Sequence, residues 1–375
     1  MIDTLEIRNE NRIVIGIIDT AKSVIWHSVY YGVGDFEIYA QADPHNLALL
    51  EVDNYVTRQN NDEVGIIASV EIQFSIQEGY MIIARGRFAK SLLERRLIFN
   101  LSGSVNKATI LSGNVESAIR QVVSDNAIDC SFDSRRNLPV LELGASAGLT
   151  ATIIDGEGDS AQKQVSYQNL LDYTDGVLQE YRYSSKVIYN DSNGKLQYVC
   201  FEGVDRSTDN DDGNEPMVFA VDFDNLNSSD YLYDESTLRN TALIGGEGEG
   251  LARFYALLTG GQSGLDLREI FVDAASVNKT YRDSSDFEHT YTDAQYRSML
   301  KQKGAEELAQ LIVTENFSGD INTSFGLYKY GVDYGLGDII TVQDNYIGKY
   351  INTRITEATE VQDENGYRID VVFGS

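Results

Sequence analysis

The sequence is poor in cysteine and lacks any long hydrophobic segment, and each shortage excludes a class of protein. Only two cysteines, Cys130 and Cys200, occur among 375 residues, so we expect neither a disulfide framework nor a CxxC-type zinc site. The longest apolar runs, such as residues 13–18, are far shorter than the roughly 20 residues that a membrane-spanning helix needs. The N-terminus, MIDTLEIRNENR, has acidic residues where a signal peptide has a basic run followed by an apolar stretch. We therefore expect neither export nor direct membrane insertion.

The sequence is also short of basic residues. It has 30 Lys plus Arg against 58 Asp plus Glu, which gives a net charge of -28. This balance argues against a protein that grips nucleic-acid phosphates or an anionic membrane, since both need local positive charge. The hydrophobic fraction of 42% is that of an ordinary globular chain, so the charge does not mark a disordered tail. At about 150 residues per domain, the length indicates several folded domains.

What the sequence does contain favours β-structure. There are 32 glycines and 23 tyrosines beside only 3 prolines, and glycine-rich turns between tyrosine-bearing segments are typical of strands. Short β-branched or aromatic runs fill most of residues 1–100 and return after residue 181 and again after residue 337. Asn193-Gly194 and Asn365-Gly366 each separate two apolar runs, which is a strong signal for a β-hairpin.

Three segments in the middle of the chain are predicted as helices. Apolar residues at spacings of three and four predict helices after the capping cluster Ser112-Gly-Asn114 and after Ser166, which is a suitable N-cap. Thr292 opens the clearest helix, which we expect to run towards Val313 with Gly304 as a kink or break. The sequence therefore predicts β-regions at both ends with helical material between them.

One segment matches a catalytic motif, and we interpret it as structural. Gly144-Ala-Ser-Ala-Gly148 fits the nucleophile elbow G-x-S-x-G, which places a serine on a turn between a strand and a helix. The residues that follow, LTATII, have the pattern of a strand, and only His289 lies downstream as a base. A glycine turn between two strands is the better interpretation.

Other features that suggest a ligand also have plainer explanations. The acidic loop 209–215 does not fit the EF-hand register, so it is better explained as a surface loop, although weak calcium binding stays open. The glycine run 245–250 lacks the lysine of a phosphate-binding loop. The three histidines, at positions 27, 45 and 289, share no metal-ligand spacing. We therefore predict no catalytic, metal-binding or cofactor-binding residue, no cofactor and no enzyme activity.

Five stretches spread over most of the chain carry a recognisable combination of motifs. They are residues 25–39 (IWHSVYYGVGDFEIY), 84–96 (ARGRFAKSLLERR), 240–253 (NTALIGGEGEGLAR), 267–273 (LREIFVD) and 326–338 (GLYKYGVDYGLGD). Together and in this order they resemble the tail-hub proteins of siphophages. That family is related in fold to the baseplate hub of contractile-tailed phages and to the N-terminal part of tail-associated lysins.

The resemblance implies an α+β, mainly β fold with two tube-type β-barrel domains and smaller attached α/β domains. It places the first barrel at 1–100, a small α/β domain at 101–181, the second barrel at 182–235 and 314–375, and an inserted α/β domain at 236–313. The glycines of two Gly-Asp motifs are expected to form tight turns at strand entries. The residues of these structural turn motifs are Gly34, Asp35, Phe36, Gly337 and Asp338.

The resemblance also implies a structural hub of a phage tail tip or baseplate, which closes the tail tube as a homotrimeric ring and docks receptor-binding proteins for DNA delivery. Expected partners are the distal tail protein, the tail tube ring and receptor-binding or tape-measure proteins, in a virion assembled in the host cytoplasm. Larger members carry a C-terminal wall-cleaving or carbohydrate-binding extension, and this chain stops at Ser375. Receptor binding and wall cleavage are therefore expected of other proteins. A β-rich surface adhesin or carbohydrate-binding module is the alternative, favoured by the 10% aromatic content, and a tail-tip hydrolase is third.

The net charge has two interpretations that both stay open. Carboxylates lining the lumen of a ring would repel phosphates and let DNA pass without specific binding. Acids spread over every outer surface would instead serve solubility.

Overall fold

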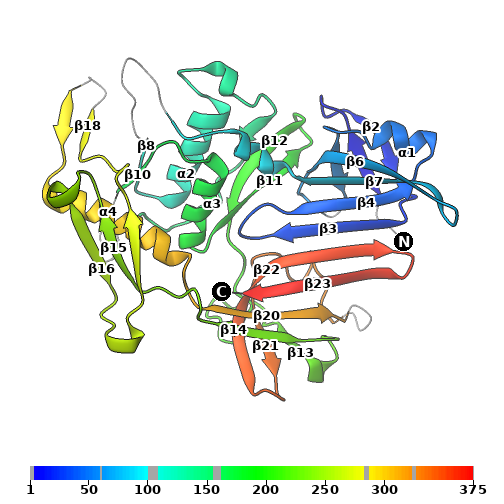
Figure 1. Cartoon of the computed structure of the whole chain (residues 1–375). Helices are drawn as coiled ribbons and strands as arrows, with labels where there is room; N and C mark the ends of the chain where they lie inside the picture. The colour runs from blue at the N-terminus through cyan, green and yellow to red at the C-terminus, as the bar shows by residue number, and fades with distance from the viewer. Residues whose placement is uncertain are drawn as a thin grey trace. The chain divides into compact units, whose positions relative to one another are not determined.

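The computed structural model describes residues 4–59, 61–99, 109–154, 162–282, 287–322 and 327–374 (Figure 1). The predicted mainly β fold is confirmed. The chain forms two compact units, each assembled from segments that are distant in sequence. Unit 1 comprises Met1–Ser91, Ser184–Tyr233 and Glu315–Ser375, and unit 2 comprises Leu92–Tyr183 and Asp234–Thr314. The division into four domains stays a prediction, and its boundary at 100–101 lies outside the described residues.

Unit 1 contains most strands from both ends of the chain. Its N-terminal segment forms β1 (Leu5–Arg8), β2 (Val14–Ile18), β3 (Ser23–Val29), β4 (Asp35–Gln41), helix α1 (Pro44–Leu49), β5 (Tyr55–Arg58), β6 (Gly65–Ser75) and β7 (Gly79–Phe88). The later segments form β11 (Ser184–Asn190), β12 (Lys195–Phe201), β13 (Val218–Ala220), β14 (Asp230–Asp234), β20 (Thr314–Ile321), β21 (Ile339–Asp344), β22 (Lys349–Asp363) and β23 (Gly366–Gly374). The hairpins predicted at Asn193-Gly194 and Asn365-Gly366 are confirmed, because they join β11 to β12 and β22 to β23.

A single sheet joins the two ends of the chain. Its strand order is β14-β20-β23-β22-β3-β4-β7-β6-β5-β1-β2, with β21 beside β22 and β13 beside β21. The joint is the antiparallel pairing of residues 23–29 in β3 with 357–363 in β22, which lie side by side in Figure 1 as blue and red arrows. We call this joint the seam. Both β-regions therefore contribute strands to one continuous sheet, whereas β11 and β12 pair in a separate sheet, and closure of either region into a barrel stays a prediction.

Two parts of unit 1 share the same strand pattern. The order β3-β4-β7-β6-β5 in the first part matches β14-β20-β23-β22-β21 in the second, and both sets occur in the same order along the sequence. Each contains one long strand whose pairing shifts by a residue, at Ile67/Ser69 in β6 and at Ile355/Glu357 in β22. Such a bulge bends the strand and changes its neighbours. We call these parts repeat 1 and repeat 2.

The register confirms that the two repeats correspond residue by residue near the bulges. Ile67 pairs with Gly86, which pairs with Phe36, whereas Ile355 pairs with Phe373, which pairs with Phe317. The pattern thus aligns Phe36 with Phe317, and each is almost fully buried in the core of its own repeat. Trp26 lies at the centre of the first core, with its ring centroid 5.5 Å from that of Phe36.

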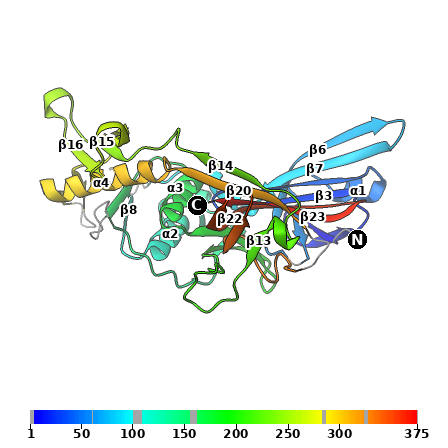
Figure 2. The same cartoon turned by 90° about the horizontal axis from the view of Figure 1, so that it is seen from below.

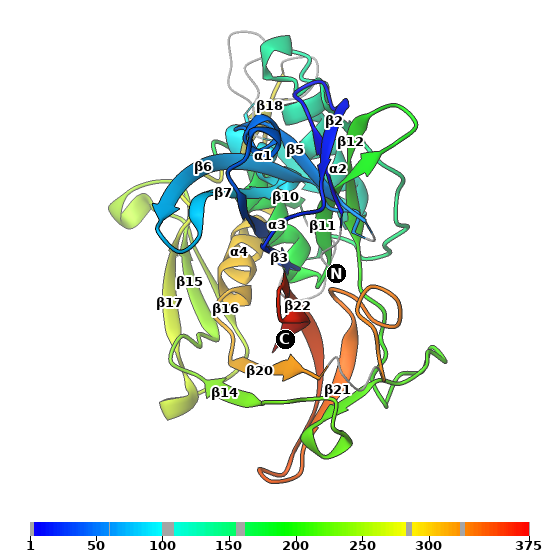
Figure 3. The ribbon, with the colours of Figure 1, turned by 90° about the vertical axis from the view of Figure 1, so that its right-hand side faces the viewer.

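Unit 2 contains the longer helices and several small sheets. It forms β8 (Thr109–Ser112), α2 (Val115–Val123), β9 (Leu141–Leu143), β10 (Gln162–Val165), α3 (Leu170–Glu180), β15 (Thr241–Gly245), β16 (Tyr255–Thr259), β17 (Glu269–Asp273), β18 (Thr280–Arg282), β19 (Glu288–Thr290) and α4 (Asp293–Ala309). Strand β15 pairs antiparallel with β16 and parallel with β17, and α4 packs against this sheet (Figure 3). Nowhere in the described ranges is a helix long and apolar enough to span a membrane.

The three predicted helices form, with two differences. Within the predicted capping cluster, Asn114 is the residue that caps α2, and Thr292 caps α4 at its predicted start. The cap of α3 is Asn169 and not Ser166, because the Asn169 side chain accepts hydrogen bonds from the first backbone amides of the helix. Gly304 does not break α4, which runs on to Ala309. A Cβ at Gly304 would lie 2.8 Å from the Ile244 side chain, so this glycine allows close packing of the helix on β15.

Candidate functional site

The first Gly-Asp motif lies at the turn that leads from β3 into β4. A Cβ at Gly34 would lie 2.0 Å from the carbonyl oxygen of His27, so the backbone approach excludes any side chain. Asp35 begins β4 and is exposed, whereas Phe36 points into the core and is 1% exposed. The motif therefore combines a close backbone contact, a polar outer side chain and a core anchor.

The second Gly-Asp motif packs against the same end of β3. Gly337 has a φ of +90°, and a Cβ there would lie 2.3 Å from the ring of Tyr30, which follows β3 directly. The carboxylate of Asp338 accepts hydrogen bonds from the Val204 amide at 2.8 Å and from Nε of Arg206 at 3.1 Å. The structure thus brings both motifs to the end of β3, and the second also fastens the chain that follows β12.

On the outer face of the seam, His27 lies between two carboxylates. Its Nδ1 is 3.2 Å from Asp35 on β4, and its Nε2 is 3.0 Å from Glu357 on β22. Both contacts are hydrogen bonds only when each ring nitrogen carries a proton, which makes the imidazole positively charged. The two carboxylates lie at opposite ends of the ring and cannot converge on one ion. In the part of the chain that the structure describes, no group of three or more His, Cys, Asp or Glu side chains is arranged to hold a metal.

On the inner face of the seam, a buried ion pair joins the two repeats. The guanidinium of Arg58 on β5 binds the carboxylate of Glu360 on β22 through two contacts of 3.0 and 2.6 Å. The two side chains are only 6% and 8% exposed. Tyr367 donates a third hydrogen bond to Glu360 at 2.9 Å, and burial followed by the Glu360 charge raises the pKa of Tyr367. Sequence reasoning missed this pair, because the partners are 302 positions apart and neither belongs to a motif.

The outer face of the sheet is polar across the seam. The register places on this face the acids Asp35, Glu37, Glu71, Glu357, Asp363 and Asp370 and the arginines Arg85, Arg87 and Arg368. Several are paired with one another, since Arg85 contacts both Glu37 at 2.6 Å and Glu71 at 2.9 Å. Acids outnumber arginines here much as acids outnumber bases in the whole chain, at 58 against 30. The face is therefore acidic, but its ratio of acidic to basic residues is close to that of the whole chain.

A cavity of about 560 Å³ lies beside the seam and is lined by all three segments of unit 1. Its wall includes Ser28 of β3, Glu63, Lys186 of β11, and Tyr330 from the stretch 326–338. The Ser28 hydroxyl donates to the Glu63 carboxylate at 2.7 Å. Burial raises the pKa of Glu63 to about 7, although the hydrogen bond from Ser28 and the charge of Lys186 act in the opposite direction. This carboxyl group therefore titrates near neutral pH.

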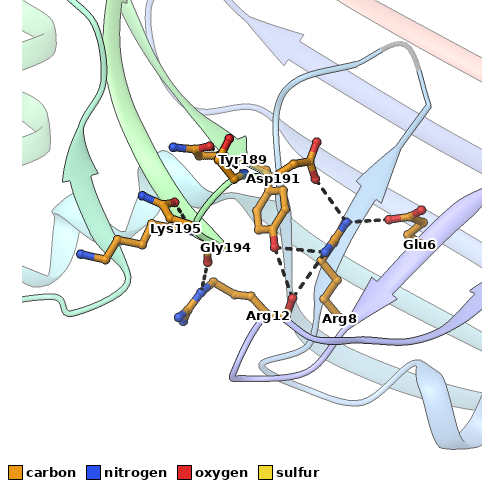
Figure 4. A network of polar contacts seen from close by, with 10 residues as sticks. Glu6, Arg8, Arg12, Tyr189, Asp191, Gly194 and Lys195 are labelled. Carbon is orange, nitrogen blue, oxygen red and sulfur yellow. Dashed lines mark hydrogen bonds and ion pairs between the residues drawn. The ribbon is translucent and has the colours of Figure 1, made fainter.

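The β11–β12 hairpin is fastened to the first strand by a cluster of polar side chains (Figure 4). The guanidinium of Arg8 lies 4.2 Å from the centroid of the Tyr189 ring and donates to its hydroxyl at 3.1 Å. Arg8 also contacts Glu6 at 2.7 Å and Asp191 at 3.8 Å, and Arg12 donates to the carbonyl of Gly194. These contacts position the hairpin, and they leave the Arg8 charge balanced by carboxylates.

The segment that matches the nucleophile elbow is a loop held by a carboxylate. Residues 149–154 are not helical, as we expected, but the predicted turn between two strands is only partly confirmed, because 144–151 form an irregular loop and Thr152 makes an isolated bridge in place of the second strand. The buried Glu116 side chain accepts the backbone amides of Ala147 at 2.7 Å and Leu149 at 3.0 Å. Burial raises the pKa of Glu116, but the hydrogen bonds from Ala147, Leu149 and Ser146 together with the charge of Arg120 outweigh it, and the net shift is downward. The amides of Ala147 and Leu149 are thus already engaged by Glu116, so in this arrangement they are not free to stabilise the oxyanion of a substrate.

The two remaining loops have ordinary structural explanations. In the loop 209–215, Asn210 accepts from the Asn214 amide at 3.1 Å and donates to the Ser207 carbonyl at 2.6 Å, so asparagines hold the turn. The glycine run follows β15, and a Cβ at Gly246 would lie 2.6 Å from the Tyr296 hydroxyl. Close packing therefore accounts for Gly246.

His289 stacks on Tyr281 with ring centroids 5.3 Å apart.

Comparison with known proteins connects this fold to phage tails. A family model described as Siphovirus ReqiPepy6 Gp37-like protein matches residues 4–375. A comparison with curated proteins finds no match. The fold is similar to a tail protein from Neisseria meningitidis MC58, with a TM-score of 0.58, 11% identity and coverage of 100% of this chain and 97% of that one.

Two prophage proteins share the same fold. The 43 kDa tail protein of prophage MuSo2 from Shewanella oneidensis has a TM-score of 0.56 and 10% identity, covering 99% of this chain and 98% of that one. Tail protein gp18 from a Listeria monocytogenes EGD-e prophage has a TM-score of 0.51 and 11% identity, covering 100% and 94%. At these identities the likeness shows a shared fold. Together with the family match, it confirms the resemblance to siphophage tail proteins and supports a structural role in a phage tail. The chain belongs to the siphovirus ReqiPepy6 Gp37-like protein family.

Proposed function

We propose that this protein is the structural hub of a siphovirus tail tip or baseplate, where it closes the tail tube as a homotrimeric ring and docks receptor-binding proteins for DNA delivery. The observation that carries this proposal is the seam, which places two similar β-regions of one chain side by side in a continuous sheet. With two repeats per chain, three copies present six similar faces. This number matches a hexameric tube ring above the hub.

The proposed partners follow from that position. The tail tube ring and the distal tail protein would contact the hub from one side, and receptor-binding or tape-measure proteins would contact it elsewhere. The hub would assemble in the host cytoplasm and remain at the tip of the virion tail. DNA would pass through without specific binding, because an acidic surface repels phosphates and gains nothing from counterion release.

We further propose that the protein acts by assembly and not by catalysis. The support is local: Ser146 lies in a loop held by the Glu116 carboxylate, which already binds the Ala147 and Leu149 amides. If a hydrolytic activity is found and Ser146→Ala abolishes it, this part of the proposal is wrong.

The mass of the purified protein in solution is the direct test. Light scattering at micromolar concentration is expected to give three times the chain mass of 41.7 kDa, and negative-stain images are expected to show a three-fold ring with a central hole. A monomer at that concentration would count heavily against the hub and favour the alternative of an adhesin or a carbohydrate-binding module. Glycan-array binding by such a monomer would establish the alternative.

A further inference from the structure

The half of β6 that follows the bulge is exposed, although its counterpart in repeat 2 is buried. After its bulge, β22 pairs with β3 of the other repeat over residues 357–363. The corresponding half of β6, residues 69–75, pairs on one side with β7, and its pairing with β5 ends before the bulge at Ile66. Figure 2 shows the β6–β7 hairpin projecting beyond the strands beside it.

The side chains on this half-strand have the character of an interface. Ile72 and Phe74 are 56% and 62% exposed, and the Phe74 ring lies 4.7 Å from Tyr80, which is also exposed. Counted from the bulge, Ile72 corresponds to Glu360 and Phe74 to Gln362, which are 7% and 6% exposed because repeat 1 covers them. Large apolar side chains therefore stand uncovered at positions that the other repeat buries. Two copies of a chain with a net charge of -28 repel each other. A contact between copies is therefore favoured at an apolar surface such as this one.

The strand that would cover this half-strand is identified by the same correspondence. Repeat 1 supplies β3 to cover β22, and the counterpart of β3 in repeat 2 is β14. β14 is the terminal strand at its end of the sheet. Terminal strands present backbone groups that pair readily with another chain.

The two strands are not neighbours within one chain. Six strands lie between β14 and β6 in the sheet order, β20, β23, β22, β3, β4 and β7. At about 4.8 Å per step, the two edges are roughly 34 Å apart along the sheet. Since the described chain does not pair them, we assign their pairing to two copies.

We infer that residues 69–75 of β6 pair with β14 of a second copy of this chain, repeating between copies the contact that β22 makes with β3 inside one copy. This inference rests on the proposed ring and names the surfaces that build it. The contact is heterologous, because the two surfaces differ, and such contacts close into a ring when each step turns by the right angle. Ile72 and Phe74 are its apolar anchors, and β14 contributes Leu232, which is 51% exposed.

The test compares two double variants of the full chain. Ile72→Asp with Phe74→Asp places charges in the inferred interface, and Ile13→Asp with Ile15→Asp is the matched control at and beside β2, where the side chains are 63% and 42% exposed. We expect the control to remain a trimer and the first variant to dissociate, with association weakened ~100-fold or more. Because all four side chains are exposed in a single copy, the monomer of each double variant should unfold at the same temperature as the monomer of the unmodified protein.

Cross-linking gives an independent readout. A variant carrying Ile72→Cys is mixed with single-cysteine variants at each position from 230 to 234, and a disulfide-linked dimer is expected for at least one of them. The native Cys130 and Cys200 are buried and contribute no link.

The outcomes separate this inference from the proposed function. If the unmodified protein is a trimer and Ile72→Asp with Phe74→Asp leaves it intact with no cross-link, the named interface is wrong and the ring stands. If both double variants dissociate equally, the effect is not specific to β6 and the inference also fails. If the unmodified protein is a monomer, the ring itself is wrong, and the inference falls with it.

Discussion

Both units are assembled from distant segments, but the segments inside unit 1 and those inside unit 2 are joined by different interactions. In unit 1, the seam joins the ends of the chain through backbone pairing between β3 and β22, and the Arg58–Glu360 pair adds to it. In unit 2, among the described residues, no strand of Leu92–Tyr183 pairs with a strand of Asp234–Thr314. Helix α4 instead packs against α3 and β10. Backbone pairing tolerates changes of side chain, so unit 1 should survive substitutions that separate the segments of unit 2.

The joint of unit 2 centres on Lys163, whose side chain is fully buried. Its Nζ lies 2.7 Å from Glu180 on α3 and 2.8 Å from Glu306 on α4. Burial lowers the pKa of Lys163, but the two carboxylates outweigh burial and the net shift is upward. Lys303 contacts Glu306 from the other side at 3.0 Å. One ammonium group therefore holds two elements from different segments together.

The largest expected effect comes from Lys163→Met. Removing the cation leaves Glu180 without its buried cation and leaves Glu306 with Lys303 alone, which costs about 3–5 kcal/mol of stability. Chemical denaturation should show this loss, and limited proteolysis should cut unit 2 before unit 1. Adding Glu180→Gln to Lys163→Met should recover part of the stability, since Lys303 still neutralises Glu306. An unchanged unfolding midpoint for Lys163→Met would show that helix packing alone joins unit 2.

The corresponding change in unit 1 is Arg58→Met, and we expect a smaller effect of roughly 3 kcal/mol. Glu360 keeps the hydrogen bond from Tyr367, and the paired strands on either side hold the seam in place. The double variant Arg58→Met with Glu360→Met should regain most of the stability, because no buried charge is left alone. Denaturation of the three proteins at pH 7 measures this. A larger loss for Arg58→Met than for Lys163→Met would reverse the comparison between the units.

Interactions within a few residues were predictable from the sequence. The capping cluster that contains Asn114, the helix start at Thr292 and the two Asn-Gly hairpins depend only on neighbouring backbone groups, and all four were located correctly. Ser166 failed as a cap because Asn169, three residues later, satisfies the amides of α3 better. The family was recognisable because several such local motifs occur in a fixed order.

Interactions between distant residues left no signal in the sequence. Neither Arg58 nor Glu360 differs in type from the many other charged residues, and only the fold brings them together. The resemblance implied two similar domains, but their residue-by-residue correspondence was hidden, because aligned side chains match at few positions, such as Phe36 and Phe317, and differ at others, such as Ile72 and Glu360. Gly304 looked like a helix breaker, and its role became clear only from the Ile244 side chain that packs against it. The predicted turn residues were located, but their common position at the end of β3 required the structure.

The smallest expected effect is a difference in how the stability of each unit depends on pH. The pKa of Glu63 in unit 1 is raised from 4.5 to about 7, chiefly by burial, so its native environment favours the protonated form. Its contribution to stability is full below pH 4.5 and is lost as the pH rises through 7. Glu306 in unit 2 behaves oppositely. Burial raises the pKa of Glu306, but the charges of Lys163 and Lys303 outweigh burial, and the net shift is downward. The contribution of Glu306 to the stability of the fold is therefore present above pH 4.5 and is lost on acidification.

Glu63→Gln isolates the first of these effects, because the amide is neutral at every pH and can still accept from Ser28. We expect the variant and the original protein to be equally stable near pH 4.5 and the variant to be more stable at pH 8 by on the order of 2 kcal/mol. Denaturation at several pH values measures the difference, with the exposed Glu10→Gln as a control that should show no such trend. If the difference in unfolding free energy between the two proteins is the same at every pH, Glu63 ionises with an ordinary pKa. Protonation of Glu63 then does not contribute to the stability of the seam.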